Sequence, residues 1–270
     1  GLKQGDAARE VAAQIGMDTG DATPPPRGAA SSSARTASAP ESGAKARTDW
    51  VPMLPVPADA GEPPVAHIKR GRPETRWDYR DASGALLGCI YRFQTSDGGK
   101  EVLPCCYAEH PSGAREWRWI SFRDPRPLYW PRPSDALGTA RAVLVVEGEK
   151  CADAARICLD EWFDVCTWPG GGKAVGKVDW SPLAGRRVVL WPDCDAKRDK
   201  SGELLAAEHQ PGIVAMRRVA EILAPMGCVV RMVEIPAPGE KPDGWDVYDA
   251  ALEVESSDAL RAWIVERLRA

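Results

Sequence analysis

The sequence predicts an α/β fold: a parallel sheet flanked by helices, preceded by a small antiparallel β-rich subdomain and a disordered N-terminal linker. Three observations lead to this prediction. Apolar runs alternate with helical patterns after residue 141, short strand patterns joined by tight turns fill residues 65–133, and residues 18–49 hold, apart from proline, no apolar side chain larger than alanine. Apolar strands joined by crossover helices are typical of a parallel sheet covered on both faces.

The N-terminal quarter divides into a helix and a linker. Ala8, Val11, Ala12 and Ile15 recur at helical spacing, so residues 6–17 are expected to form an amphipathic helix, and residues 1–17 to be the remnant of a preceding domain. Residues 18–64 are rich in Pro, Ala and Ser and cannot bury enough surface to offset their ordering entropy. We expect them to be a disordered linker whose end, residues 50–64, is an extended lead-in.

The remaining chain divides into a β-rich subdomain at residues 65–138 and a second domain at residues 139–270. In the first, strand patterns and turns alternate. The predicted strands are residues 76–80, 86–93, 102–107 and 117–122. In the second domain, the predicted strands are residues 142–146, 165–168, 187–191 and 229–235, and the predicted helices are residues 151–158, 214–223 and 259–268.

Composition excludes several classes of protein. Lys and Arg number 35 against 39 Asp and Glu, a net charge of −4, so a nucleic-acid partner would have to contact a local patch. No apolar run reaches the roughly 20 residues that a membrane helix needs, and no signal peptide is recognisable. The eight cysteines include no C-x-x-C pair. We therefore expect no membrane association and a cytoplasmic, reducing location.

Carboxylates follow two of the predicted strands. Glu147 ends the first parallel strand, and Asp193 and Asp195 follow the strand at residues 187–191. Alternate residues of an extended segment point to the same side, and ligands of open parallel sheets lie beyond the carboxyl ends of the strands. Glu147, Asp193 and Asp195 should then converge as hard oxygen donors for Mg²⁺ or Mn²⁺. The alternative is that they are ordinary acidic turns and helix caps.

These residues, taken together, resemble a known family. V-L-V-V-E-G-E-K, P-G-G-G-K, V-V-L-W-P-D-C-D and D-G-W-D-V-Y-D-A, in this order, are similar to the TOPRIM domain of bacterial-type primases, topoisomerases and some nucleases. The resemblance is closer to TOPRIM modules of phage and mobile-element primase/helicase proteins, in which a β-rich segment and an R-P-L-Y element precede the domain. It covers residues 65–255. The opening 17 residues resemble the helix that follows a primase zinc-binding module.

The resemblance implies roles for individual residues. Glu147 takes the place of the family's invariant glutamate, and Asp193 and Asp195 the place of its D-x-D metal ligands. Asp246 resembles a further acidic position of primases, as a fourth metal ligand. The expected cofactor is Mg²⁺ or Mn²⁺, and the expected partners are a single-stranded DNA template, nucleoside triphosphates and a replicative helicase domain or protein.

Basic residues near the acids are candidates for nucleic-acid or nucleotide binding. Lys173 ends a glycine-rich segment that fails the Walker A template, because Ala174 stands where a Ser or Thr is required. This segment is either a flexible turn or an edge that a phosphate can approach closely. Arginines and aromatics alternate in residues 115–133, where Arg118, Arg123 and Arg126 could contact phosphates. For the tryptophans there, a buried strand face is the favoured alternative to stacking on bases.

Three hypotheses on function follow. The first is a DNA primase-type module that joins nucleotides on a single-stranded template. The second keeps the fold and the metal but cleaves nucleic acid, since the same acids serve both reactions. The third is a non-catalytic nucleic-acid-binding module of a helicase, whose binding would depend on salt but not on Mg²⁺.

Overall fold

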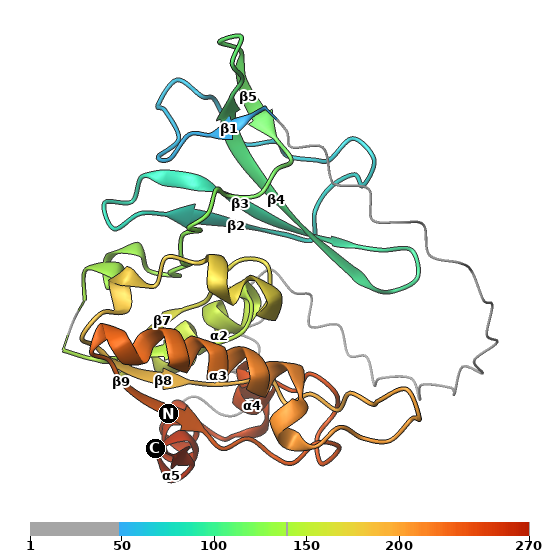
Figure 1. Ribbon diagram of the computed structural model, residues 1–270, viewed down its shortest axis with the longest axis vertical. Helices are drawn as coiled ribbons and strands as arrows, with labels where there is room; N and C mark the ends of the chain where they lie inside the picture. Colours follow the sequence, from blue (N-terminus) through green and yellow to red (C-terminus); the bar gives the residue numbers. More distant parts are fainter. Residues whose placement is uncertain (1–48, 139, 270) are drawn as a thin grey trace.

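The computed structural model describes residues 49–138 and 140–269, so the helix predicted at residues 6–17 and most of the predicted linker lie outside the described residues. The described chain forms two five-stranded sheets, one antiparallel and one mostly parallel (Figure 1). The predicted α/β fold, with an antiparallel subdomain before a parallel sheet, is confirmed. None of the helices in this part is both long and apolar enough to cross a lipid bilayer.

The antiparallel sheet is a meander of three long strands with two short ones at its edge. β2, β3 and β4 pair in sequence order, and both β1 and β5 pair with β4. In β2 the buried Trp77 and Tyr79 alternate with more exposed residues, as the sequence predicts. In β3 and β4, four consecutive residues are buried, because both faces of the sheet are covered there. The strands are β1 (Val51–Pro52), β2 (Thr75–Arg80), β3 (Leu86–Gln94), β4 (Lys100–Glu109) and β5 (Arg115–Arg118).

Two segments of this subdomain differ from the prediction. The segment at residues 50–64, assigned to the linker, packs on the sheet: β1 pairs with β4, and the Tyr91 hydroxyl donates to the carbonyl of Pro64 over 2.8 Å. Prolines do not prevent pairing at a sheet edge. The strand predicted at residues 117–122 ends at Arg118, because Trp119 then packs on the ring of Tyr91 and Phe122 on the ring of Tyr79.

The second sheet has the order β10-β9-β8-β6-β7, so β6 and β8 lie at its centre. Pairs among β6, β7, β8 and β9 are parallel, and β10 adds an antiparallel edge. The sequence did not predict β10, β1 or α4, which are all shorter than eight residues. The elements are β6 (Ala142–Val145), α2 (Glu149–Leu159), β7 (Phe163–Cys166), β8 (Arg187–Leu190), α3 (Pro211–Leu223), β9 (Val229–Val233), α4 (Val247–Glu253), α5 (Ser257–Glu266) and β10 (Leu268–Arg269).

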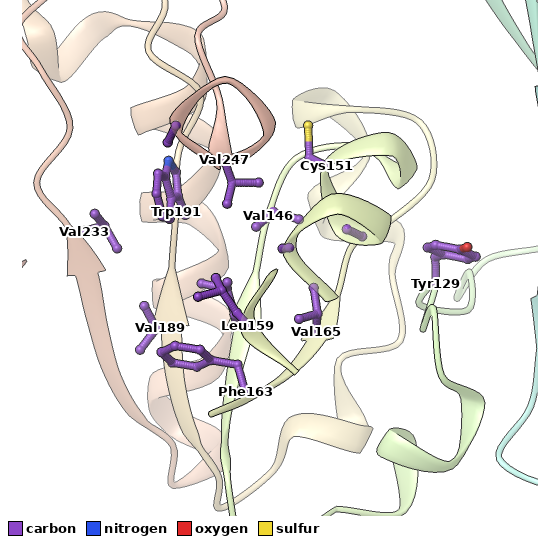
Figure 2. Close-up of a cluster of buried hydrophobic side chains, with 14 of the residues drawn as sticks. Tyr129, Val146, Cys151, Leu159, Phe163, Val165, Val189, Trp191, Val233 and Val247 are labelled. Atoms are coloured by element: carbon purple, nitrogen blue, oxygen red, sulfur yellow. The ribbon is translucent and has the colours of Figure 1, made fainter. Parts of the chain in front are cut away.

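The alternation of β6 builds two cores. Leu144 and Val146 point into a cluster with α2, α4 and α5, whereas Val143 and Val145 point into a cluster with α3 on the other face. Figure 2 shows the first cluster, to which Val146, Leu159 of α2 and Val247 of α4 all belong. Residues of both faces of β6 are fully buried, which is why the strand reads as a continuous apolar run.

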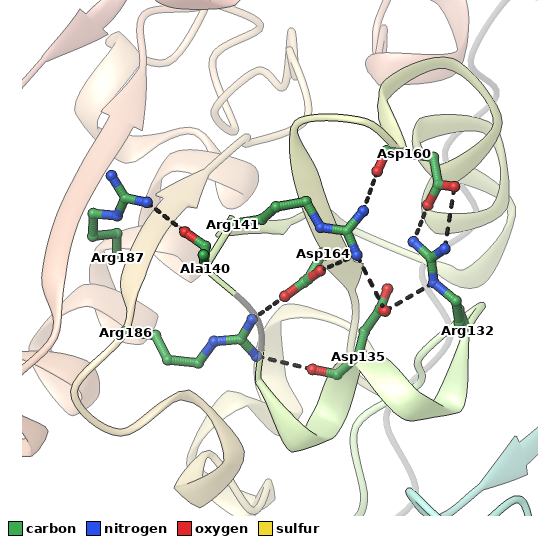
Figure 3. A network of polar contacts seen from close by, with 8 residues as sticks. All are labelled: Arg132, Asp135, Ala140, Arg141, Asp160, Asp164, Arg186 and Arg187. Atoms are coloured by element: carbon green, nitrogen blue, oxygen red, sulfur yellow. Dashed lines mark hydrogen bonds and ion pairs between the residues drawn. The ribbon is translucent and has the colours of Figure 1, made fainter.

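The amino edge of the parallel sheet is closed by ion pairs (Figure 3). Asp164 of β7 has no exposed surface and forms ion pairs with Arg141, over 2.7 Å, and with Arg186. Arg132 pairs with Asp160 and with Asp135, the latter over 2.8 Å. Buried charges are tolerated when they are paired in this way, so this edge holds its acids in compensated form.

The two sheets are joined through α2. Asp153 accepts from Trp77 Nε1 over 2.7 Å and from the Tyr129 hydroxyl over 2.8 Å, and Glu149 accepts from the Tyr79 hydroxyl over 2.7 Å. Trp77 and Tyr79 belong to β2, and both join the core cluster that contains α2. The antiparallel subdomain is therefore packed onto the parallel sheet by apolar contact and by buried hydrogen bonds.

We expect Asp153→Ala to lower the free energy of unfolding by about 2–4 kcal/mol, because it leaves two buried donors, the Trp77 indole and the Tyr129 hydroxyl, without an acceptor. Urea denaturation measures the change. Glu161→Ala is the control, since this exposed residue follows α2 and should change the free energy of unfolding by less than about 0.5 kcal/mol. An equal effect of both substitutions would contradict the role of Asp153 in joining the sheets.

Candidate active site at the carboxyl edge of the parallel sheet

The carboxyl ends of β6 and β8 bring the acidic residues together. The two strands are neighbours, with Val145 opposite Leu190, and Trp191 N donates to the Val145 carbonyl over 2.9 Å just beyond them. Asp193 N donates to Glu147 Oε1 over 3.3 Å. The Glu147 carboxylate thus meets the backbone of Asp193, 46 residues later in the chain, at one edge of the sheet.

The N-terminus of α3 forms the floor under these acids. Gly212, the second residue of α3, donates its N–H to Asp195 Oδ2 over 2.7 Å, and only 11% of the Asp195 side chain is exposed. A Cβ on Gly212 would lie 2.6 Å from the Asp193 carbonyl oxygen and 2.9 Å from Glu147 Oε1. Only glycine lets the helix approach so closely, and the positive end of the helix dipole favours carboxylates there.

The acids repel one another. Burial raises the pKa of Glu147, and the charge of Asp195 raises it further, although the hydrogen bond from Asp193 N opposes this. Burial also raises the pKa of Asp193, and the charges of Glu147, Asp246 and Asp195 add to the rise. Unlike the amino edge, the carboxyl edge thus holds negative charge that the protein compensates only in part.

Asp246 lies close to Asp193, but both of its carboxylate oxygens accept hydrogen bonds from neighbouring groups. Its Oδ1 accepts from the backbone N–H groups of Tyr248 and Asp249, over 2.7 and 3.2 Å, and so caps α4. Its Oδ2 accepts from the thiol of Cys151 over 3.0 Å. Asp246 therefore contributes charge near Asp193, while both of its oxygens already have partners.

The glycine-rich segment packs against α3, the same helix that the acids contact. A Cβ on Gly172 would be 3.2 Å from the Cβ of Ala215, which is one helical turn beyond Gly212. A Cβ on Gly170 would be 2.7 Å from Arg126 Nη1, so the Arg126 guanidinium packs directly on the segment. Lys173 follows it and is exposed. The segment thus packs on α3 one turn beyond Gly212, and Arg126, which packs on the segment, also pairs with Asp124 over 2.9 Å.

The other two predicted arginines lie differently. Arg118 pairs with Glu116 over 2.8 Å, and its guanidinium stands 4.8 Å from the ring centre of Trp50. β5, which carries it, is at the end of the antiparallel sheet far from the parallel sheet (Figure 1). The structure does not bring Arg118 to the acids. Arg123 is exposed, three residues before Arg126.

Sequence reasoning missed three residues of this site. Gly212 is signalled only by its place after Pro211 at the start of a helix. Lys100, the first residue of β4, lies close enough for its charge to lower the pKa of both Asp193 and Glu149, although it comes from the other sheet. Thr167, at the end of β7, accepts a hydrogen bond from Gly148 N over 3.0 Å. Neither Lys100 nor Thr167 has a signal in the sequence.

The donor chemistry fits a hard divalent cation, because Glu147, Asp193 and Asp195 offer carboxylate oxygens where negative charge is in excess. A closed cage is not assembled: within residues 49–138 and 140–269, no three His, Cys, Asp or Glu side chains form a group that could hold a metal ion. Mg²⁺ commonly binds through one or two carboxylates, with waters and substrate phosphates completing its shell. The residues present therefore suit a cation whose remaining ligands are waters or phosphate oxygens.

A cavity of about 1170 Å³ lies on the other side of the start of α3. It is lined by Ile213, Ile235, Trp245 and Trp263 among others, and by none of Glu147, Asp193 and Asp195. Gln210 lies between this cavity and the loop of the acids. It lines the cavity, and its Oε1 accepts from the backbone N–H of Lys197, two residues after Asp195, over 2.9 Å.

Solved structures similar to this chain include a DNA primase domain from Pseudomonas aeruginosa, with 19% identity, a TM-score of 0.44 and coverage of 72% of this chain and 51% of that one. The primase fragment of the bacteriophage T7 primase-helicase protein has 16% identity, a TM-score of 0.41 and coverage of 71% and 60%. The Aquifex aeolicus primase, with its zinc-binding and RNA polymerase domains, has 15% identity, a TM-score of 0.44 and coverage of 71% and 39%.

Each of the three is a DNA primase or a part of one. This is the class of protein that the sequence motifs resemble. The chain spans about half of the first structure and three-fifths of the second. No family model matches the chain, and no curated protein matches it.

We expect Gly212→Ala to destabilise the protein by about 1–3 kcal/mol, because the new methyl group would overlap the Asp193 carbonyl oxygen, which is backbone and cannot move aside alone. It should also weaken Mn²⁺ binding, measured by calorimetry, because the loop with Asp193 must shift. Gly176→Ala is the matched control, since a Cβ there has open space around it. If both variants retain wild-type stability and Mn²⁺ affinity, the close packing at Gly212 has no consequence.

The raised pKa values also predict a dependence on pH. Glu147 and Asp193 hold their protons to higher pH in the folded protein than in the unfolded chain, so their contribution to stability falls as the pH rises above about 4. In EDTA at pH 8, Asp193→Asn should therefore raise Tm by about 2–4 °C, corresponding to about 1 kcal/mol. Mn²⁺ should raise the Tm of the wild type but not of this variant. Asp258→Asn, at an exposed position of α5, should match the wild type in both measurements.

Proposed function

We propose that this chain contains the TOPRIM catalytic module of a DNA primase-type protein from a phage or integrated element, and that it joins nucleotides on a single-stranded DNA template in a reaction that requires Mg²⁺ or Mn²⁺. One observation supports this proposal most directly. The acids contact α3 at Gly212, and the glycine-rich segment, on which Arg126 packs, contacts the same helix at Ala215, one turn later. Such a place suits a cation and the phosphates that it neutralises.

The acids would hold the cation. Asp193 and Asp195 are its proposed ligands, with Glu147 as a further ligand or as the base, and Asp246 adds negative charge nearby. A bound Mg²⁺ would offset the charge of the triphosphate and orient it for in-line displacement. Arg126, Lys173 and the exposed Arg123 would contact phosphates from the other side, because guanidinium groups match phosphate oxygens in geometry.

The reaction is a displacement at phosphorus. The 3′-hydroxyl oxygen of one nucleotide forms a bond to the α-phosphorus of the next, the bond between that phosphorus and the bridging oxygen breaks, and pyrophosphate leaves. The hydroxyl proton must be accepted. Glu147 is a candidate because its raised pKa lies nearer to neutral pH than that of an ordinary carboxylate, which suits a general base.

The antiparallel subdomain would hold the template. Lys100 belongs to this subdomain, and its positive charge lowers the pKa of Asp193. Arg123 and Arg126 lie in the segment that connects the two sheets. Arg118 would contact only nucleic acid that extends along the subdomain. The resemblance to primase/helicase proteins adds a replicative helicase domain or protein as a proposed partner.

Primer synthesis tests the proposal. Purified protein is incubated with single-stranded DNA, labelled ribonucleoside triphosphates and Mg²⁺, and products are resolved by length. We expect products that EDTA abolishes and that Asp193→Asn reduces by about 10²-fold, since loss of a metal ligand removes charge stabilisation of the displacement. Asp258→Asn serves as the control and should retain wild-type yield.

Equal yields from the wild type and Asp193→Asn would refute the assignment of these acids. The same preparations are also given a labelled oligonucleotide without nucleotides. Cleavage that depends on Mn²⁺ and on Asp193 would instead identify a nuclease. Salt-sensitive DNA binding, with neither reaction and with no response to Mg²⁺, would identify a binding module.

A further inference from the structure

The turn that carries Glu147 connects two parts of the protein. Glu147 reaches the acids, whereas Glu149, two residues later, is 8% exposed and accepts from Tyr79 of the antiparallel sheet. Between them stands Gly148, with φ 82° and ψ 151°, a conformation that other residues rarely adopt. A glycine restricts its own rotation little, so another contact must hold the direction in which Glu147 leaves the strand.

Thr167 supplies that contact. Its hydroxyl oxygen accepts from Gly148 N over 3.0 Å, and Thr167 has no exposed surface. Gly148 is exposed, so without this acceptor its N–H could turn to solvent and take Glu147 with it. Thr167 follows β7, which lies beside β6, and it is therefore held by the sheet rather than by the turn that it restrains.

The backbone of Thr167 is fixed in turn by Tyr129. The two residues exchange both backbone hydrogen bonds, over 2.9 and 3.0 Å. The hydroxyl of Tyr129 donates to Asp153, which lies on α2, the helix that begins at Glu149. The contacts thus form a closed ring from Gly148 through Thr167, Tyr129 and Asp153 back along α2.

The same segment also fixes Arg126. Arg126 N donates to the Lys177 carbonyl over 2.7 Å, and Asp179 N donates to the Arg126 carbonyl over 2.8 Å. Residues 126–129 therefore lie between the glycine-rich segment, which Arg126 contacts, and the turn of Glu147, which Thr167 holds. One short extended segment sets the separation between the basic and the acidic side of the site.

We propose that Thr167 is a positioning residue: its hydroxyl orients the turn at Gly148, and so directs the carboxylate of Glu147 toward the divalent cation, in register with Arg126. This inference rests on the proposed function, since it assumes that Glu147 faces a cation. It assigns to Thr167 no contact with substrate. The chemistry requires only a hydroxyl oxygen at this place, so serine should replace threonine and valine, of the same shape, should not.

The test compares Thr167→Val with Thr167→Ser in the full chain, with Mn²⁺ alone as the probe. Calorimetric titration should show the Mn²⁺ dissociation constant raised about 10-fold or more in Thr167→Val, the size of effect seen when a group that orients a metal ligand is lost, and within about 3-fold of the wild type in Thr167→Ser. Amide hydrogen exchange at Gly148 should be faster in Thr167→Val only. Tyr91→Phe is the control, because it removes the hydroxyl of another fully buried residue, bonded to the Pro64 carbonyl, outside the site.

The outcomes separate the two proposals. If the wild type binds Mn²⁺ and Thr167→Val binds it equally well, the inference on Thr167 is wrong and the proposed function is unaffected. If Thr167→Ser loses affinity as Thr167→Val does, the effect is one of packing and the inference is wrong again. If the wild type neither binds Mn²⁺ nor synthesises primer, the proposed function fails and the inference fails with it. Loss of affinity in Thr167→Val alone supports the assignment.

Discussion

Crowding of like charges at the carboxyl edge of the parallel sheet is the constraint on which the rest of the structure depends. Glu147 and Asp193 are forced together because β6 and β8 are central, paired strands, and the charges of Asp195 and Asp246 add to their repulsion. At the amino edge, by contrast, Arg141 and Arg186 compensate the fully buried Asp164. At the amino edge every acid of the network is paired with an arginine, whereas the carboxyl edge keeps a negative charge that an external cation can offset.

The surrounding elements hold this unfavourable arrangement in place. α3 approaches through Gly212 and offers a helix N-terminus to Asp195, and α2 begins at the turn that directs Glu147. Both helices are fixed by well-packed apolar faces, on opposite sides of the sheet. The stability of the two cores can therefore offset the repulsion among the acids, as is common where a site is arranged for binding rather than for stability.

Much of this arrangement could be predicted from the sequence, because it follows from local patterns. The central strands are apolar runs, and the carboxyl ends of parallel strands meet, so the meeting of Glu147 with Asp193 follows from order along the chain. The edge strands β1 and β10 have two residues each, too few for any period to be read. The capping role of Asp246 and the distance of Arg118 from the acids depend on how separate elements pack, which no spacing in the sequence contains.

Contacts between the two sheets could not be predicted from the sequence either. Asp153 looks like an ordinary polar residue of a helix, and nothing in the sequence indicates that it accepts from Trp77, 76 residues earlier. Glu149 resembles a residue that favours a helix start, yet its carboxylate is buried against Tyr79. Such pairings become visible only when the antiparallel subdomain has been docked, because the burial that makes them strong does not exist in either part alone.

The docking of β2 onto α2 also bears on how the molecule comes apart. Trp77 and Tyr79 belong to the same apolar cluster as residues of the parallel sheet, so the two sheets share one core cluster besides the separate cluster that each of them has. If a protease cut the connection between them, the two halves would still adhere. A shortened chain beginning at β6 would expose α2, with the carboxylates of Glu149 and Asp153, to water. The boundary between the subdomains thus separates two sheets in the chain order but not two independent folding units. The two sheets should therefore unfold together in one cooperative transition.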